Sequence, residues 1–168
     1  MKYVFAILML LLVIPQNTEA VSLKAGGGML FDPTRWGGHL SLEIPLGSDH
    51  PTYLAPFVEF YQKSQVKEIP IGISLLYKAP LSELLGTIYF GVGGGVFLSR
   101  VTFTDQVLGT VKLSRTEPMI SVTGGIRLDV SDRMGLYTQV YLLRPFETGS
   151  TTVFGVQAGL HFEIGEKD

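Results

Sequence analysis

The stretch Thr151-Thr-Val-Phe-Gly-Val-Gln-Ala-Gly-Leu-His-Phe-Glu-Ile164 alternates with a period of two residues. Its even positions are apolar from Phe154 to Ile164, and its odd positions from Gly155 to Glu163 carry glycine or polar side chains. Successive side chains of a β-strand point to opposite faces. The pattern therefore predicts a strand with one apolar face and one polar face.

The same alternation recurs along the rest of the chain in runs of roughly ten residues that end at turn residues. The predicted strands are Val21–Phe31, Trp36–Pro45, Tyr53–Tyr61, Glu68–Tyr77, Gly86–Arg100, Pro118–Val130, Met134–Arg144 and Thr151–Ile164. Eight such runs predict an all-β fold, an eight-stranded antiparallel up-and-down transmembrane β-barrel. Two details follow from the sequence. Pro56 predicts a bulge in the third strand or a start at Phe57, since proline cannot donate to the ladder. Val101 to Glu117 is the one long loop expected.

The N-terminus has the pattern of a secretory signal peptide. Met1-Lys2 is the positive region, Val4 to Ile14 is apolar, and Thr18-Glu19-Ala20 offers a cleavage site. The apolar run is shorter than the ~20 residues that a membrane-spanning helix needs, and no run of about 18 follows it. We expect residues 1–20 to be removed and residues 21–168 to form a single barrel domain.

Composition narrows the class further. Charged residues make up 17% of the chain, against about 25% in soluble domains. The absence of cysteine excludes disulfides, metal–thiolate sites and the acylated cysteine of a lipoprotein. A net charge of −2 gives no basis for nucleic-acid binding. We expect no cofactor and no metal.

Alternation also predicts which side chains point into the barrel. In the fifth, sixth and eighth strands, the even positions from Ile88 to Leu98, from Ile120 to Val130 and from Phe154 to Ile164 carry neither charge nor polar side chains and are assigned to the lipid face. The opposite face holds charges of both signs, which pair if they are buried in a narrow interior. The polar lumen network predicted in this way, structural or forming a proton or ion path, consists of Lys24, His39, Glu43, Glu59, Arg127, Asp129, Gln157, His161 and Glu163.

These features resemble the small eight-stranded outer-membrane barrels of bacteria, the OmpA/OmpX/OmpW-like class. The sharper element is the C-terminal insertion signal of that class, matched here by Gln157, Gly159, Phe162 and Ile164, although four more residues follow. The resemblance implies a bacterial outer-membrane location and assembly by the barrel-assembly machinery. It also implies contact with outer-membrane lipid and lipopolysaccharide, and a monomer.

A catalytic site has one candidate in the sequence. His39, Ser41 and Glu43 share one strand face, and some outer-membrane barrel enzymes that act on lipids use histidine and serine. Neighbours at i and i+2 lie roughly 6–7 Å apart along a strand, beyond the ≈ 2.6–3.2 Å of a nucleophile–base hydrogen bond. The His-x-Ser-Asn pattern of the known deacylases also lacks its asparagine, because Leu42 stands there. We therefore predict no catalytic residue.

Trp36, Tyr53, Tyr61, Tyr77 and Phe146 fall near predicted strand ends and suggest an interfacial aromatic girdle. Four functions remain open. The first, which we favour, is a surface protein with a structural, adhesive or stress-related role carried by its loops. The others are a narrow channel or carrier for small hydrophobic molecules, a soluble lipocalin-like binding barrel, and a lipid-modifying enzyme.

Overall fold

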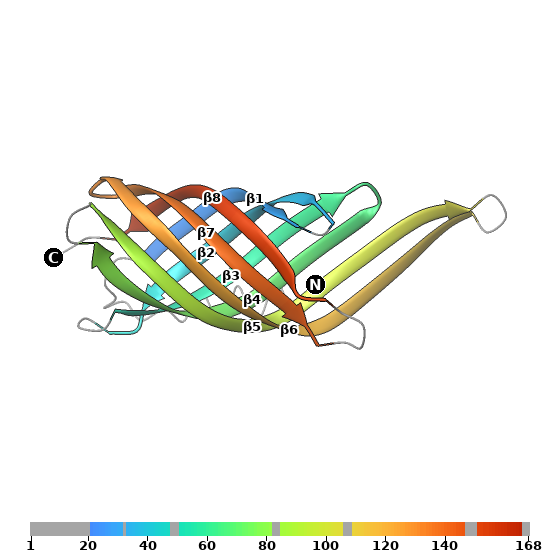
Figure 1. Cartoon of the computed structure of the whole chain (residues 1–168), viewed down its shortest axis with the longest axis horizontal. Helices are drawn as coiled ribbons and strands as arrows, with labels where there is room; N and C mark the ends of the chain where they lie inside the picture. The colour runs from blue at the N-terminus through green and yellow to red at the C-terminus, as the bar shows by residue number, and fades with distance from the viewer. Residues whose placement is uncertain are drawn as a thin grey trace.

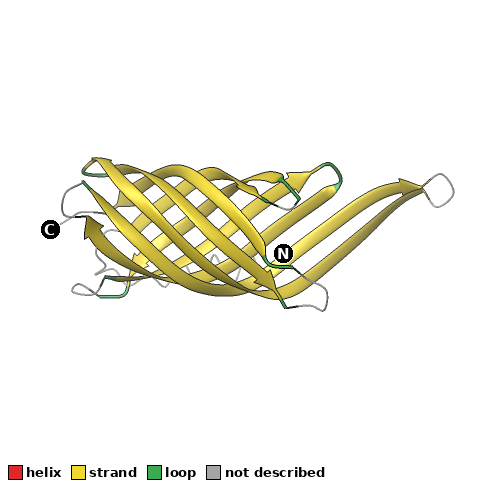
Figure 2. Ribbon diagram, in the orientation of Figure 1, coloured by secondary structure: helices red, strands yellow, loops and turns green. Residues whose placement is uncertain are grey.

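The computed structural model describes residues 21–31, 33–47, 51–81, 85–105, 109–146 and 151–165, so the predicted signal peptide lies outside the described residues. Eight strands make up almost all of this part of the chain (Figures 1 and 2). They are β1 (Val21–Leu30), β2 (Arg35–Pro45), β3 (Thr52–Lys63), β4 (Val66–Leu81), β5 (Gly86–Asp105), β6 (Gly109–Ser131), β7 (Met134–Pro145) and β8 (Val153–Ile164). None of the described ranges contains a helix that is long and apolar enough to cross a membrane.

The sheet closes on itself. Each strand pairs antiparallel with the next, and β1 pairs with β8 from Val21↔Ile164 to Leu30↔Gly155. The predicted eight-stranded up-and-down barrel is confirmed. Closure leaves no free edge within the ring. β1 begins at the same end of the barrel at which β8 ends, because Val21 pairs with Ile164.

Side chains alternate around this ring as a membrane barrel requires. Phe90 and Val92 on β5 point outward with 61% and 60% of their surface exposed, whereas Tyr89 between Ile88 and Phe90 is buried in the lumen. The lumen side also holds the buried Lys24 and Glu43. A water-soluble lipocalin-like barrel needs the opposite arrangement, so the apolar outer surface excludes that alternative.

The prediction for Pro56 is wrong. β3 begins at Thr52 and runs straight through Pro56, which lies opposite Ile73 of β4. Its pairing with β2 keeps one register on both sides of the proline, from Ser41↔Phe57 to Ile44↔Leu54. The missing N–H removes a donor locally, but two neighbouring strands hold the chain in place. The register shift in the ladders falls instead at Asp129/Ser131, near the end of β6.

The predicted loop from Val101 to Glu117 is also wrong. Both strands continue through it, because β5 extends to Asp105 and β6 starts at Gly109, and they form a hairpin that projects well beyond the barrel (Figure 1). Beyond the lipid both faces of a strand meet water, so apolar–polar alternation is no longer needed there. The turn between β3 and β4 is likewise tighter than predicted and places Ser64 at φ 53°.

Only part of the predicted aromatic girdle is outside the barrel. Trp36, Tyr77 and Phe146 are 68%, 44% and 58% exposed on the outer surface. Tyr61 is fully buried, and the ring of Tyr53 lies 3.6 Å from the buried Lys78 ammonium. Both tyrosines occupy inward positions of β3, so strand-end location alone did not reveal their direction.

Candidate functional site

Glu43 of β2 is the centre of an ionic cluster inside the barrel. Its two carboxylate oxygens lie 2.6 Å from the ammonium groups of Lys24 on β1 and Lys78 on β4. His161 of β8 approaches the same carboxylate at 3.5 Å. These side chains are almost fully buried, so the charges neutralise one another in the absence of bulk water. The sequence prediction missed Lys78, because the fourth strand was ended at Tyr77 although the alternation of Ser74 and Leu76 continues into Lys78.

A second cluster surrounds Arg127 of β6. Its guanidinium lies 2.9 Å from Asp129 and 3.5 Å from Glu163, and it also reaches His161 at 3.1 Å and Thr87 at 3.4 Å. Asp129 is the more exposed partner, with 37% of its side chain accessible, against 15% for Glu163. His161 joins this cluster to the Glu43 cluster, so six strands are tied together by charged or polar contacts.

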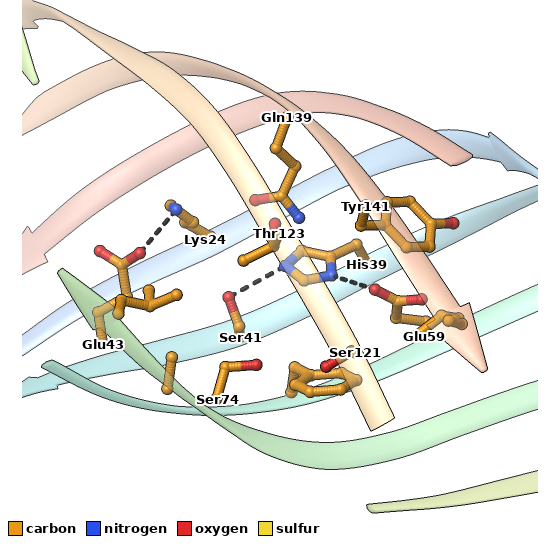
Figure 3. Close-up of a pocket in the computed structure, with 14 residues that line it drawn as sticks. Lys24, His39, Ser41, Glu43, Glu59, Ser74, Ser121, Thr123, Gln139 and Tyr141 are labelled. Atoms are coloured by element: carbon orange, nitrogen blue, oxygen red, sulfur yellow. Dashed lines mark hydrogen bonds and ion pairs between the residues drawn. The ribbon is translucent and has the colours of Figure 1, made fainter. Parts of the chain in front are cut away.

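His39 lies between a hydroxyl and a carboxylate. Its Nε2 is 3.0 Å from Ser41 Oγ and its Nδ1 is 3.1 Å from Glu59 Oε1 on β3 (Figure 3). The spacing argument against a His39–Ser41 hydrogen bond was wrong, because the two side chains lean toward each other across the roughly 6–7 Å that strand geometry puts between residues i and i+2. The carboxylate partner is Glu59 from the neighbouring strand, whereas Glu43 points away to Lys24.

Serine, imidazole and carboxylate therefore stand in the order that activates a nucleophile in hydrolases. The surroundings limit what this order can do. All three residues are buried, and they line a cavity of ≈ 40 Å³ together with Phe57 and Tyr141. At roughly 10–15 Å³ for each water position, this cavity has room for a few water molecules. An acyl chain or a lipid headgroup is far larger.

Amide and phenol groups continue the network from Glu59. The Gln157 amide donates to Glu59 Oε1 at 2.8 Å and to the Tyr61 hydroxyl at 2.6 Å. Gln157 in turn accepts from the amide of Gln139, and the hydroxyls of Tyr141 and Tyr61 meet each other. The structure therefore places the polar residues predicted for the lumen in two layers, one ionic and one built on His39, Glu59 and Gln157. Tyr89 joins the layers, because its ring lies 3.6 Å from the Lys24 ammonium and its hydroxyl donates to Gln139 at 2.9 Å.

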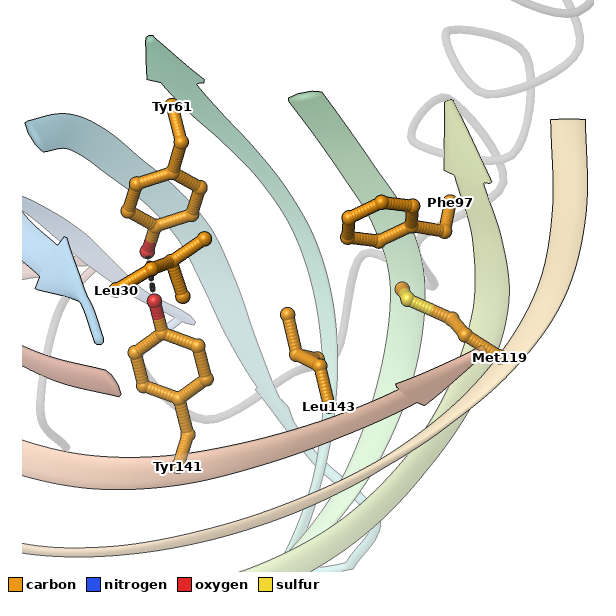
Figure 4. Packing of buried hydrophobic residues seen from close by; sticks show 6 residues of the cluster. All are labelled: Leu30, Tyr61, Phe97, Met119, Tyr141 and Leu143. Atoms are coloured by element: carbon orange, nitrogen blue, oxygen red, sulfur yellow. Dashed lines mark hydrogen bonds between the residues drawn. The ribbon is translucent and has the colours of Figure 1, made fainter. Parts of the chain in front are cut away.

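An apolar plug covers this second layer at the end of the lumen nearest the β5–β6 hairpin. Its members are Leu30, Tyr61, Phe97, Met119, Tyr141 and Leu143, which pack together with at most 6% exposure (Figure 4). Inward-facing glycines make room for its aromatic rings. A Cβ on Gly37 would stand 2.4 Å from the Tyr61 ring, and one on Gly155 would stand 2.4 Å from the Tyr141 ring.

The residues of the proposed insertion signal lie along β8. Gln157 points into the lumen, whereas Ile164 points outward with 54% of its surface exposed. Gly159 packs closely on β1, where an added Cβ would meet the Gly26 Cα at 2.5 Å. The role of these residues in assembly stays a prediction. Among the described residues no three metal-ligating side chains converge on a common point.

No protein-family model and no curated protein matches this sequence. The fold does match solved structures. Neisserial surface protein A matches with a TM-score of 0.65 at 14% identity, covering 86% of this chain and 96% of that one. Ail, the attachment invasion locus protein of Yersinia pestis, matches at 0.57 and 10% identity, covering 86% and 97%. The outer membrane enzyme PagL matches at 0.50 and 10% identity, covering 86% and 100%.

The closed antiparallel ring, the apolar outer surface and the polar lumen define this protein as an outer-membrane β-barrel. Within that class it has the architecture of the small eight-stranded bacterial barrels, which confirms the resemblance inferred from the sequence. The fold is shared by surface proteins and by an enzyme, so it does not by itself define the biochemical role.

Proposed function

We propose that the protein is a closed membrane anchor that presents the β5–β6 hairpin as an adhesive surface outside the cell. The observation that carries this proposal is the length of the hairpin. Pairing of β5 with β4 ends at Val66↔Val101, and pairing of β6 with β7 begins at Met119↔Pro145. β5 and β6 nevertheless stay paired with each other out to Asp105↔Gly109.

The hairpin offers two features that bind extended polypeptides. From Gly109 to Ser114, β6 has no strand beside it on its outer edge within the described part of the chain, and such edges accept an added strand. One face of the hairpin is apolar, because the cross-strand pairs Val101↔Leu113 and Phe103↔Val111 lie on it. Leu113 is 57% exposed and Phe103 is 38% exposed. We infer that the partner is an extended protein segment with apolar side chains. Ail, which shares the fold, is named for attachment and invasion.

A shortened hairpin tests this role. Residues 103–111 are replaced by Asn-Gly, which favours a two-residue hairpin turn between the paired Thr102 and Lys112 and keeps both of these residues. Cells carrying the shortened barrel should lose attachment to surfaces coated with extracellular-matrix proteins, while heat-modifiable barrel remains in the outer membrane. Phe103→Thr with Leu113→Thr is the matched variant, which keeps the hairpin but removes its apolar face and should attach weakly. Attachment equal to the parent by the folded, shortened barrel would reject the adhesive role.

The filled lumen supports a closed anchor over the alternative of a narrow channel. The plug that includes Leu30 and Leu143 and the ionic cluster of Glu43 follow each other along the lumen axis. We expect purified protein in planar bilayers to give no unitary conductance steps. Leu30→Ala combined with Leu143→Ala should open gaps in the plug and serves as the comparison. Unitary conductance steps from the parent protein would instead favour the narrow channel over the closed anchor.

The size of the cavity beside Ser41 supports a role without catalysis. The test is covalent labelling of the folded barrel with a fluorophosphonate, which reacts with activated serines. The parent and Ser41→Ala should label equally weakly. Labelling of the parent that Ser41→Ala and His39→Gln both abolish would instead establish a serine hydrolase.

A further inference from the structure

Three cations gather on the outer surface where the hairpin leaves the barrel. Lys67 of β4 lies directly opposite Arg100 of β5, so their side chains share one face at a Cβ separation of roughly 5 Å. Arg100 in turn lies opposite Ser114 of β6, two residues from Lys112 on the same face. Lys112 is therefore a diagonal neighbour of Arg100, at roughly 7–8 Å. All three side chains are exposed.

Within the described part of the chain, this cationic group has no neutralising partner on its own surface. The outward positions of β4, β5 and β6 in the described ranges hold no carboxylate. The neighbouring acid Glu68 points inward and pairs with Arg35 at 3.2 Å, and Glu117 pairs with Arg115 at 2.6 Å. The one described contact that orders the group is neutral, a 3.3 Å hydrogen bond from Arg100 Nε to Ser114 Oγ. The surface is thus complementary to an anion.

The group lies at the boundary of the apolar belt. Below it on the same face are Ile69 and Ile71 of β4 and Leu98 of β5. The outward row of β5 from Ile88 to Leu98 is free of polar side chains and matches the ~9–11 residues that a tilted strand needs to cross the hydrocarbon core. Arg100 is the next outward residue, which puts the cations at the level of lipid headgroups on the side of the hairpin.

We propose that Lys67, Arg100 and Lys112 form a binding site for the phosphate groups of lipopolysaccharide in the outer leaflet. Ammonium and guanidinium groups bind phosphate through charge-assisted hydrogen bonds. The apolar row that includes Ile69 and Leu98 lies where the acyl chains of the same molecule would pack. Lipopolysaccharide bound at this site would hold the hairpin side of the barrel at a fixed depth in the outer leaflet and would limit rotation of the barrel about its axis. It does not depend on adhesion, because the apolar face and the edge of the hairpin are separate from this face.

The test compares binding of fluorescent lipid A carrying both phosphates with binding of its dephosphorylated form, in mixed micelles with the folded protein. The variant Lys67→Gln/Arg100→Gln/Lys112→Gln should bind phosphorylated lipid A at least about tenfold more weakly than the parent, with a shallower dependence on salt. Dephosphorylated lipid A should not distinguish the two proteins. Arg133→Gln, in the turn between β6 and β7 at the opposite end of the barrel, is the matched control and should bind like the parent.

Three results would overturn the proposal. Equal affinity of the triple variant, verified as folded by heat-modifiability, would show that the cations do not contribute. Tight binding of dephosphorylated lipid A would show that the phosphates are not recognised. A soluble sulfated oligosaccharide that binds the parent as tightly as lipid A would assign the site to free polyanions instead.

Discussion

Lys24 Nζ and Glu43 Oε1 are 2.6 Å apart on neighbouring strands, and both side chains are at most 3% exposed. The ammonium also lies 3.6 Å from the centre of the Tyr89 ring, so a cation–π contact supports the ion pair. Lys78 shares the same carboxylate. Among the residues that the structure describes, Glu43 is therefore the one acid that holds two buried cations, and the loss of its charge should cost more stability than any other change in this lumen.

Glu43→Gln keeps the shape of the side chain and removes its charge. We expect the free energy of unfolding in lipid vesicles, measured with urea, to fall by about 3–5 kcal/mol, because two buried ammonium groups lose their counter-charge. Adding Lys24→Met should restore part of that loss. Asp129→Asn is the control and should cost less than about 1 kcal/mol, since its side chain is 37% exposed. Equal losses in the two single variants would contradict this ranking.

Arg127→Leu removes the cation shared by Asp129 and Glu163. The expected loss is on the order of 1–3 kcal/mol, smaller than for Glu43→Gln because both acids retain some contact with water. Adding Glu163→Gln should recover part of it. Glu59→Gln should recover nothing, because Glu59 bonds to His39 and Gln157 in the other layer. If Glu59→Gln recovered part of the stability lost in Arg127→Leu, Arg127 would have to interact with Glu59 as well as with the acids of its own layer.

The sequence predicted the strand number, the closure of the barrel and the direction of the lumen side chains, because the membrane imposes strict alternation. Outside the membrane the strands no longer need to alternate apolar and polar side chains. The hairpin beyond Arg100 therefore lacks the alternation, and the sequence wrongly predicted a loop there. The His39–Ser41 contact was missed for a different reason. Backbone spacing sets the distance between two Cβ atoms, but not the lean of the two side chains. Glu59, the partner of His39, comes from another strand, and its register was not evident from the sequence.

The orientation of the barrel is testable at the two ends of β6. Both termini of an even-stranded barrel lie on one side, and the insertion signal is expected at the periplasmic end. An epitope tag inserted after Gly109 should therefore bind antibody on intact cells. The same tag in the turn at Asp132 should be reached only after permeabilisation. The reverse pattern would invert the barrel and would remove the basis of both the adhesive role and the lipopolysaccharide site.

Phe162→Ala combined with Ile164→Ala tests the predicted insertion signal. The protein should still be exported but should fail to assemble, giving periplasmic degradation or aggregation and no heat-modifiable barrel. Phe154→Ala with Val156→Ala is the matched control, because it removes similar apolar groups from the outward face of β8 away from the signal. Normal assembly of the Phe162→Ala/Ile164→Ala variant would show that the barrel-assembly machinery does not require the C-terminal motif. Failure of both would point to loss of apolar surface.

Val92→Arg tests the outward face on which the membrane assignment depends. Val92 is 60% exposed, lies near the middle of the apolar row of β5, and is flanked across the sheet by the outward Leu75 and Val122. An arginine there meets hydrocarbon with neither water nor a counter-charge, so the free energy of unfolding should fall by roughly 2–4 kcal/mol and assembly should be poor.

The control is Leu113→Arg, which makes the same kind of change at a side chain that is 57% exposed on the hairpin, beyond the lipid. This variant should alter the free energy of unfolding by less than about 0.5 kcal/mol. The readout is urea unfolding of both variants and the parent in the same lipid vesicles. A Val92→Arg protein as stable as the parent would mean that this face does not meet lipid.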